Sequence, residues 1–583
     1  MVLAKMHNIL VSSGKVLQAP PSSSDLLPNS GESSSSQDVQ STAVGPTAGN
    51  ALTRYKPGKA DIFLLGITIV IGGEYFDWNG GVQAGAFSFI IAYFLIGVGY
   101  LLLTCCIAEI NGALPFAGGA YGLARCTLGF YPAFMIGCCD ITEYIVYVSA
   151  SVISFAELIV GAAPSLAPYH PLTWAIFYVA ALAITIKGDR VFWIVSGLLG
   201  VLSIFFLVLF CFGSLPYVNF SKYAAIPDYE FIGGFRGFML ALPHAAWFFV
   251  GIEALSLACD QIDAPKKVIP VAQLSCISIV FVTGVMVVFV TLSLAPGVVD
   301  LPTNDIPFNL GFTQFLGISN ESSALLSLPG AFGTAFGFMW AYGKLIAALS
   351  TSKLLFPVFA RTTASSNTPY NALLIGSAWS YALCILVYFL PQVGDSFVGI
   401  CMLSAAMSYS GQCIGYIALK RNYRNIKSSE FRSPFGIAGA ICSLLVWILM
   451  ATTLLTIHDD GGIDAMGFAL IVIFYTLFYF CYARKRQTFS PQENKIMLVA
   501  HVTKFNIKKV ANRQNRRQRK GSGSSSHAGN GTETSLSERA RNALKERLSF
   551  SAKSSGSRKL IPVSPLSVTS TGSAKLLSPA PKP

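Results

Sequence analysis

One interrupted hydrophobic segment sets the architecture of this chain: Ile67-Thr68-Ile69-Val70-Ile71-Gly72-Gly73-Glu74-Tyr75-Phe76-Asp77-Trp78-Asn79-Gly80-Gly81. A helix that enters a bilayer near Asp61 and rises about 1.5 Å per residue reaches Gly72 roughly halfway across a hydrocarbon core of about 30 Å. Unpaired backbone groups and a carboxylate are costly at that depth, so such a break persists only where it is packed in protein or faces a wet cavity. We therefore interpret Ile71, Gly72, Gly73 and Glu74 as part of a substrate or ion site. The alternative is a glycine kink for helix packing, with Glu74 already in the headgroup region.

The composition is that of a polytopic membrane protein. Of the 583 residues, 53% are hydrophobic and 12% are charged, and the hydrophobic residues come in blocks of roughly 17 to 25, the length of membrane-spanning helices. The sequence therefore predicts an all-α fold with twelve spans: 61–78, 86–109, 130–160, 172–186, 191–214, 237–257, 269–292, 329–352, 371–390, 396–419, 434–457 and 464–482. These make up a transporter domain over residues 58–482, between an N-terminal tail (1–57) and a C-terminal tail (483–583) that are both expected to be mostly disordered.

The charges of the loops predict the orientation. Loops on one side of the predicted spans carry eighteen Lys and Arg residues, whereas loops on the other side carry only Lys222 and Arg236. Because basic residues near span ends resist translocation, we expect both termini to be cytoplasmic. The two long exterior loops each hold a glycosylation sequon, at Asn219 and at Asn320, which favours a eukaryotic surface or secretory-pathway membrane. Of these we expect the plasma membrane.

The C-terminal tail carries the basic charge of the chain. It holds 21 Lys and Arg against 4 Asp and Glu, whereas the whole chain has a net charge of +13. Because this tail adjoins the last span, we expect it to bind anionic lipid at the membrane surface and not nucleic acid. Residues 535–548 have a capping-box start and an apolar residue every four positions, which predicts a surface helix; a solvated, fluctuating tail is the alternative.

The predicted sixth span is interrupted as well. It reads Leu240-Ala241-Leu242-Pro243-His244-Ala245-Ala246-Trp247-Phe248-Phe249-Val250-Gly251-Ile252-Glu253-Ala254, with a glycine and a carboxylate inside an apolar segment. Breaks in the first and sixth spans predict two five-helix halves of inverted topology, with the site between them at the break points.

Two motifs resemble those of a known transporter superfamily. The stretch Ala108-Glu109-Ile110-Asn111-Gly112-Ala113-Leu114-Pro115-Phe116-Ala117-Gly118-Gly119-Ala120-Tyr121-Gly122-Leu123-Ala124-Arg125 resembles the Glu…Pro-x-x-Gly-Gly-x-Tyr…Arg signature of the amino acid-polyamine-organocation transporters. The stretch Ala258-Cys259-Asp260-Gln261-Ile262-Asp263-Ala264-Pro265-Lys266-Lys267-Val268-Ile269-Pro270 is similar to the acidic and Pro-basic-basic-x-x-Pro loop of that superfamily. Within it, the ethanolamine permeases are resembled most, through Ile71-Gly72-Gly73-Glu74 with Trp78-Asn79, Asp140-Ile141-Thr142-Glu143-Tyr144, and Trp247-Phe248-Phe249…Ile252-Glu253.

This resemblance implies a twelve-helix secondary transporter with a five-plus-five inverted repeat, driven by cation coupling or by exchange. It implies that Trp247, Phe248 and Phe249 close over the substrate beside Gly251, and that Glu253 takes part in proton coupling; packing and a structural hydrogen bond are the respective alternatives. Two departures bear on the coupling. The motif after span eight is shortened to Phe359-Ala360-Arg361-Thr362-Thr363, and Ser196 stands near the place of a lysine that many relatives carry on span five.

Two carboxylates in the third span are candidates for the substrate site. Asp140 and Glu143 lie one helical turn apart, so with Tyr144 and Tyr147 they can point together at the interrupted part of span one. Carboxylates close together in a low dielectric repel each other, which favours binding of a proton or an organic amine. Glu74 lies beside a half-helix end, where it would oppose a substrate carboxylate, so we favour an amine without a carboxylate over an amino acid. Hydrogen bonding to neighbouring helices is the structural alternative.

Lys344 is the only basic residue within a predicted span. It lies close enough to the inner interface for its ammonium group to snorkel. The sharper hypothesis is that the ammonium group takes the place of a bound sodium ion and thus serves ion coupling.

The sequence predicts no enzyme, cofactor or metal site, because it contains no phosphate-binding glycine loop, metal-ligand cluster or nucleophile motif. We expect a secondary active transporter for a small organic amine such as ethanolamine, coupled to protons or another cation. The alternatives are an amino acid or polyamine permease and, from another class, a nutrient sensor of the same fold. Uptake and binding measurements separate these three.

Overall fold

The computed structural model describes residues 55–423, 428, 430–458, 461–495, 497 and 498. Within this range all regular secondary structure is helical, so the predicted all-α fold is confirmed. The first 54 residues and the predicted tail helix at 535–548 lie outside the described residues.

Ten of the twelve predicted spans are continuous helical segments. Their bounds are α3 (Ala86–Ala113), α5 (Phe130–Ala162), α6 (His170–Lys187), α7 (Asp189–Ser214), α10 (Pro265–Leu292), α12 (Asn320–Thr351), α13 (Tyr370–Phe389), α14 (Gln392–Asn422), α15 (Gly436–Thr456) and α16 (Ile463–Phe478), the last continued by η9 (Tyr479–Ala483) and α17 (Arg484–Arg486). Span one is divided into α2 (Lys59–Val70), η1 (Ile71–Glu74) and η2 (Trp78–Ala84), and span six into α9 (Gly234–Ala246), η5 (Trp247–Phe249) and η6 (Ile252–Asp260).

Short helices join the spans. These are α4 (Gly119–Thr127), η3 (Pro164–Tyr169), η4 (Leu215–Tyr217), α8 (Phe220–Tyr223), η7 (Leu301–Thr303), α11 (Asn309–Leu316) and η8 (Pro357–Ala360). The predicted span ends agree with the structure to within a few residues for most spans. Span eight differs most, because α12 already begins at Asn320.

Among the described residues, eleven helices are long and apolar enough to cross a membrane. The predicted span that is not among these eleven is span one. Its α-helix α2 has only 12 residues, about 18 Å at 1.5 Å per residue. Because of the break, α2 by itself is too short to cross a membrane, and η1 and η2 continue the chain to Ala84.

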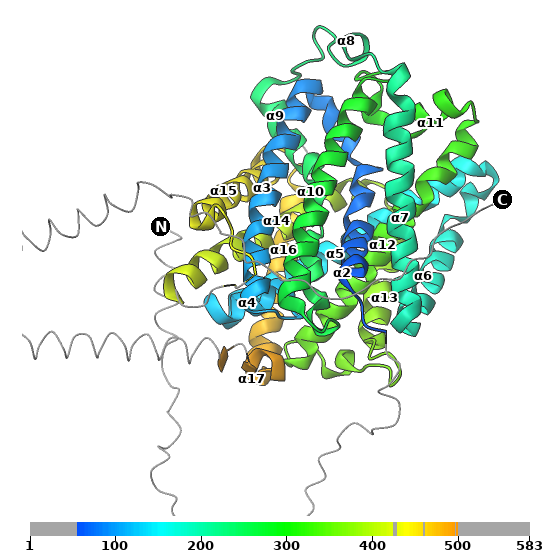
Figure 1. Cartoon of the computed structure of the whole chain (residues 1–583). Coiled ribbons are helices and arrows are strands. Elements are labelled where there is room, and N and C mark those ends of the chain that lie inside the picture. Colours follow the sequence, from blue (N-terminus) through cyan, green and yellow to red (C-terminus); the bar gives the residue numbers. More distant parts are fainter. Residues whose placement is uncertain (1–54, 424–427, 429, 459–460, 496, 499–583) are drawn as a thin grey trace, which may run out of the picture. The chain divides into compact units, whose positions relative to one another are not determined.

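The helical segments define two sides of the bundle (Figure 1). The side with α4 and α17 is called the chain-end side here, because α2 starts and α17 ends there, and the side with α8 and α11 is called the loop side. α2 lies inside the bundle and contacts α7, α10 and α12. Its residues from Leu65 to Val70 are all buried, which places the break in protein and away from lipid.

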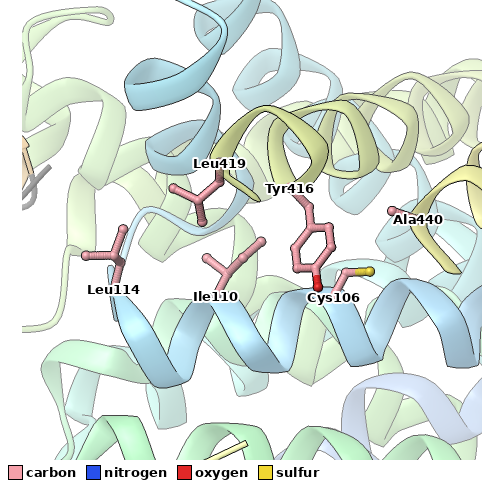
Figure 2. Close-up of a cluster of buried hydrophobic side chains, with 6 residues drawn as sticks. All are labelled: Cys106, Ile110, Leu114, Tyr416, Leu419 and Ala440. Atoms are coloured by element: carbon pink, nitrogen blue, oxygen red, sulfur yellow. The ribbon is translucent and has the colours of Figure 1, made fainter. Parts of the chain in front are cut away.

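The signature segment at the end of α3 is held by apolar contacts with two later helices. Figure 2 shows Cys106, Ile110 and Leu114 on one face of α3, where their spacing of four residues places them, against a group from α14 and α15. That group comprises Tyr416, Leu419 and Ala440. This packing fixes the end of α3, and with it the loop that leads into α4.

Candidate functional site

The α-helix of span one ends at the predicted break. The α-helix ends at Val70, and the chain continues as a tighter 3₁₀ helix over Ile71–Glu74. At Asp77, just before η2, the backbone takes a left-handed conformation with φ of 71°. The segment is thus interrupted at its paired glycines, but it stays coiled and does not become extended.

A threonine from span eight compensates for the lost helical hydrogen bond. Thr334 on α12 donates its hydroxyl to the carbonyl oxygen of Ile69. Further along, Trp78 Nε1 donates to the carbonyl oxygen of Glu74 at 3.1 Å. Backbone groups that a break exposes in lipid must find such partners, so these side chains stabilise this part of the break.

Span six breaks at the predicted glycine. Gly251 has φ of 96°, a left-handed conformation that favours glycine, and it divides η5 from η6. Glu253 follows within the first turn of η6. The acid therefore occupies the positive end of the second half of span six.

The two breaks contact each other. η1 lies against η5, and Gly72 and Gly73 leave no room for side chains there, because a Cβ at Gly72 would lie 2.4 Å from Thr334 Cγ2. The predicted segments of spans one and six are thus brought together at the centre of the bundle.

Three buried acids gather beside the span-six break. Asp140 and Glu143 on α5 and Glu253 on η6, hereafter the acid cluster, are at most 4% exposed, and they lie close enough to one another to interact electrostatically. Tyr409 on α14 donates its hydroxyl to Glu143 Oε1 at 2.6 Å, and Tyr144 donates to Glu253 Oε1 at 2.9 Å. The structure therefore brings Asp140, Glu143, Tyr144 and Glu253 together.

Each acid of this cluster keeps one oxygen without a protein partner. Asp140 Oδ1, Glu143 Oε2 and Glu253 Oε2 are buried and accept no hydrogen bond from the described part of the chain. An isolated ionised carboxylate is very costly in such surroundings. Protons or a bound cation would satisfy these oxygens, so the cluster can hold an ammonium group or exchange protons.

Glu74 is not part of this cluster. It is fully buried, and its Oε1 accepts a hydrogen bond from Thr283 on α10 at 2.8 Å. The hydrogen bond with Thr283 therefore turns Glu74 toward α10.

The three aromatic residues of span six face different neighbours. Trp247 stacks on Tyr147 of α5, with ring centroids 4.3 Å apart and planes at 19°. Phe248 and Phe249 instead pack against Tyr93 of α3, with centroid distances of 5.0 and 5.3 Å. Of the three, Trp247 alone makes ring contact with the helix that carries Asp140 and Glu143, and the other two pack between helices.

Two cavities approach the centre from opposite sides. The loop-side cavity, of about 500 Å³, is lined by residues that include Asp77, Ser154 and His244. The chain-end cavity, of about 310 Å³, is lined by residues that include Asp260 and Lys344. No member of the acid cluster lines either cavity, so the buried acids are closed off from both.

Lys344 forms an ion pair in the chain-end cavity. Its Nζ lies 2.6 Å from Asp260 Oδ2, and the lysine side chain is 11% exposed whereas that of Asp260 is 32% exposed. Asp260 is the last residue of η6, so this pair ties the end of span six to α12. Both the snorkelling and the sodium-replacement hypotheses for Lys344 stay predictions, now with a named partner.

The remaining predicted positions lie apart from the centre. Ser196 on α7 is buried, and its carbonyl oxygen accepts a hydrogen bond from Thr68 on α2 at 2.9 Å. Asn219 and Asn320 are both exposed and lie at the starts of α8 and α12. Their glycosylation stays a prediction.

Sequence reasoning missed several residues of the site. Tyr409, Thr334 and Thr283 come from spans ten, eight and seven. They donate hydrogen bonds to Glu143, to the carbonyl oxygen of Ile69 and to Glu74, respectively. Hydroxyl residues are common in transmembrane helices, where they often bond to their own backbone. No local sequence pattern therefore distinguishes these three residues from the other hydroxyl residues in the spans.

Several known proteins are similar in sequence to this chain over more than half of its length. A family model described as amino acid permease matches residues 78–495. The methylthioribose transporter of Bacillus subtilis is 26% identical over 452 residues, 73% of this chain and 92% of that protein. The branched-chain amino acid permease BcaP of Bacillus subtilis is 23% identical over 482 residues, 76% and 96% of the two chains. The aromatic amino acid transport protein AroP of Corynebacterium glutamicum is 24% identical over 349 residues, 56% and 73%.

Proposed function

Because the chain belongs to the amino acid permease family, within the amino acid-polyamine-organocation superfamily, we propose that this permease carries a small organic amine, such as ethanolamine or a related amino compound, by alternating access. The acid cluster is the proposed binding site for the ammonium group. The permease is a multi-pass integral membrane protein, and we place it in the plasma membrane with both termini in the cytoplasm, as the loop charges favour.

One observation carries the choice of an amine. Three buried carboxylates each keep an oxygen without a protein partner, and an ammonium group has three N–H donors. A cation bound among these oxygens would remove the repulsion between the acids and satisfy their hydrogen-bonding capacity together. A neutral substrate could donate hydrogen bonds but could not remove the repulsion between the acids.

A second observation speaks against a zwitterionic substrate. Permeases of amino acids can bind the substrate carboxylate at the positive end of a half-helix. In span six the first turn of the second half-helix already carries the carboxylate of Glu253. A substrate carboxylate placed there would meet a like charge, so the arrangement favours an amine that lacks one.

Alternating access follows from the two cavities. The acid cluster lies between a loop-side and a chain-end cavity that do not reach it. Movement of the halves about the two breaks would open the cluster to one cavity and then to the other. Proton exchange on Glu253, or binding of another cation, would couple this movement to a gradient.

An amino acid permease is the second candidate. It is favoured by the printed names of relatives such as BcaP, which is described as a branched-chain amino acid permease. The methylthioribose transporter, by its name, carries a substrate of another kind, so membership of the family leaves the substrate open.

Uptake into proteoliposomes tests the proposal. Purified protein is given labelled ethanolamine, putrescine, leucine or phenylalanine, with and without sodium and with and without a proton gradient. Saturable ethanolamine uptake that leucine does not compete supports the proposal. Leucine or phenylalanine uptake without ethanolamine uptake would replace it with the second candidate, and ligand binding without any flux would indicate a sensor.

A matched pair of variants connects the flux to the cluster. Asp140→Asn keeps the shape of a cluster acid but removes its charge, and it should reduce amine uptake about tenfold or more. Asp300→Asn removes a carboxylate from the exposed Asp300 between α10 and η7 and should leave uptake unchanged.

A further inference from the structure

The segment that follows the last span docks onto the chain-end side of the bundle. We define residues 488–493 as the latch segment. Its residue Glu493 is only 3% exposed, although its neighbours Gln492 and Asn494 are exposed. A buried carboxylate on a segment outside the spans needs donors that compensate for its lost hydration.

Four hydrogen-bond donors surround the carboxylate of Glu493. Its Oε1 accepts hydrogen bonds from Tyr121 Oη and Arg125 Nη1, both at 2.9 Å. Its Oε2 accepts from Ser352 Oγ at 2.6 Å and from the backbone N–H of Ser490 at 2.6 Å. Both carboxylate oxygens are thus doubly paired, with donors from α4, from the end of α12 and from the latch segment itself.

Further contacts hold the segment in register. The N–H of Thr488 donates to the carbonyl oxygen of Ser352 at 2.9 Å, and Arg125 Nη2 donates to the carbonyl oxygen of Thr488 at 3.0 Å. The Arg125 guanidinium also lies 4.8 Å from the ring centroid of Phe489. Burial raises the pKa of Tyr121, so its hydroxyl stays protonated and donates to Glu493.

The docked segment borders the chain-end cavity. Ser490, Pro491 and Gln492 line that cavity together with Asp260 and Lys344. The same contacts tie α4 to the end of α12. A change at this end of the bundle that opens the cavity would therefore have to move or release the latch segment.

We propose that Tyr121, Arg125 and Ser352 form a carboxylate-binding site for Glu493, and that the docked latch segment holds the chain-end cavity closed and slows transport. This proposal rests on the permease activity of the fold and not on the identity of the substrate.

A cross-link tests whether docking controls transport. Cys126 Sγ lies 3.2 Å from Met497 Sδ, so Met497→Cys places a second thiol beside Cys126. Oxidation should lock the segment and lower initial uptake at least about fivefold, the low end of typical allosteric couplings, and reduction should restore the rate. The control is Cys126→Ser with Met497→Cys, treated with the same oxidant.

Labelling tests docking without any substrate. In the full-length protein, the thiol introduced by Met497→Cys should react slowly with a membrane-impermeant maleimide, with Cys126→Ser present to remove its neighbour. Adding Glu493→Gln should raise that rate about tenfold, because a charged hydrogen-bonded pair is lost. Lys495→Gln, at an exposed position nearby, should leave the rate unchanged.

Two outcomes would overturn the proposal. A disulfide that forms fully and leaves uptake unchanged means that docking does not limit transport. A labelling rate that Glu493→Gln does not alter means that the carboxylate does not hold the segment. Because labelling needs no substrate, it also separates a failure of the latch from a failure of the amine proposal.

Discussion

Gly73 and Trp247 bring the backbones of the two broken spans into direct contact. A Cβ at Gly73 would lie 2.0 Å from the carbonyl oxygen of Trp247, so only a glycine at this position allows the present distance. The glycine therefore does more than interrupt a helix. It lets spans one and six approach each other where the substrate site is proposed.

Replacing this glycine should separate the two breaks. Gly73→Ala meets backbone atoms that cannot rotate away, so we expect destabilisation of about 1–3 kcal/mol and strongly reduced uptake. Thermal unfolding in detergent and initial uptake rates measure the two effects. Gly197→Ala on α7 is the control, because its nearest neighbour, Leu64 Cδ1, would lie at an ordinary 3.6 Å. Normal uptake by Gly73→Ala would show that the close approach is dispensable.

The variant Glu253→Gln should lose gradient-driven uptake but keep exchange of substrate. Gln at this position cannot take up or release a proton, so uptake driven by a proton gradient should fall to the level of empty liposomes while exchange of substrate across the membrane continues. Tyr144→Phe removes only the donor to Glu253 and should cost about 1 kcal/mol, or roughly fivefold in rate. Gradient-driven uptake that persists in Glu253→Gln would assign coupling to another group.

Lys344 and Asp260 form a pair whose role a charge reversal can isolate. Lys344→Ala leaves Asp260 without its partner and should reduce uptake. If the pair itself is required, the double variant Lys344→Asp with Asp260→Lys should recover most of the rate. If the ammonium group instead replaces a sodium ion, the reversal should fail, and added sodium should not rescue Lys344→Ala. Unchanged uptake by Lys344→Ala would exclude both a required ion pair and the replacement of a sodium ion by the ammonium group.

Glu109 should matter for stability more than for transport. Its Oε2 accepts hydrogen bonds from Tyr416 at 2.6 Å and from the backbone N–H of Ser433 at 3.1 Å, and Lys420 forms an ion pair with it. Because the Lys420 side chain is 29% exposed, we expect Glu109→Gln to cost about 2–3 kcal/mol, below the full effect for a buried pair. Thermal unfolding measures this loss.

The control for Glu109 is an ion pair at the surface. Lys267 and Glu430 lie 3.8 Å apart with side chains 66% and 36% exposed. Such pairs contribute about 0–1 kcal/mol, so Glu430→Gln should barely change the unfolding temperature. Equal effects of the two variants would mean that Glu109 does not anchor α3.

The number of spans, their order and the positions of the two breaks could be predicted from the amino-acid sequence alone. These features are local, because hydropathy and glycine act within one turn or one span of the chain. The motif residues Tyr121 and Arg125 could likewise be read directly, although not what they bind.

Folding in three dimensions decided which partners these residues have. Tyr144 meets Glu253 across 109 positions, Tyr409 meets Glu143 across 266, and Tyr121 meets Glu493 across 372. It also turned Glu74 toward Thr283. Lipid-facing helices are all similarly apolar, so no local pattern encodes which helices pack together; close packing and interhelical hydrogen bonds select the neighbours.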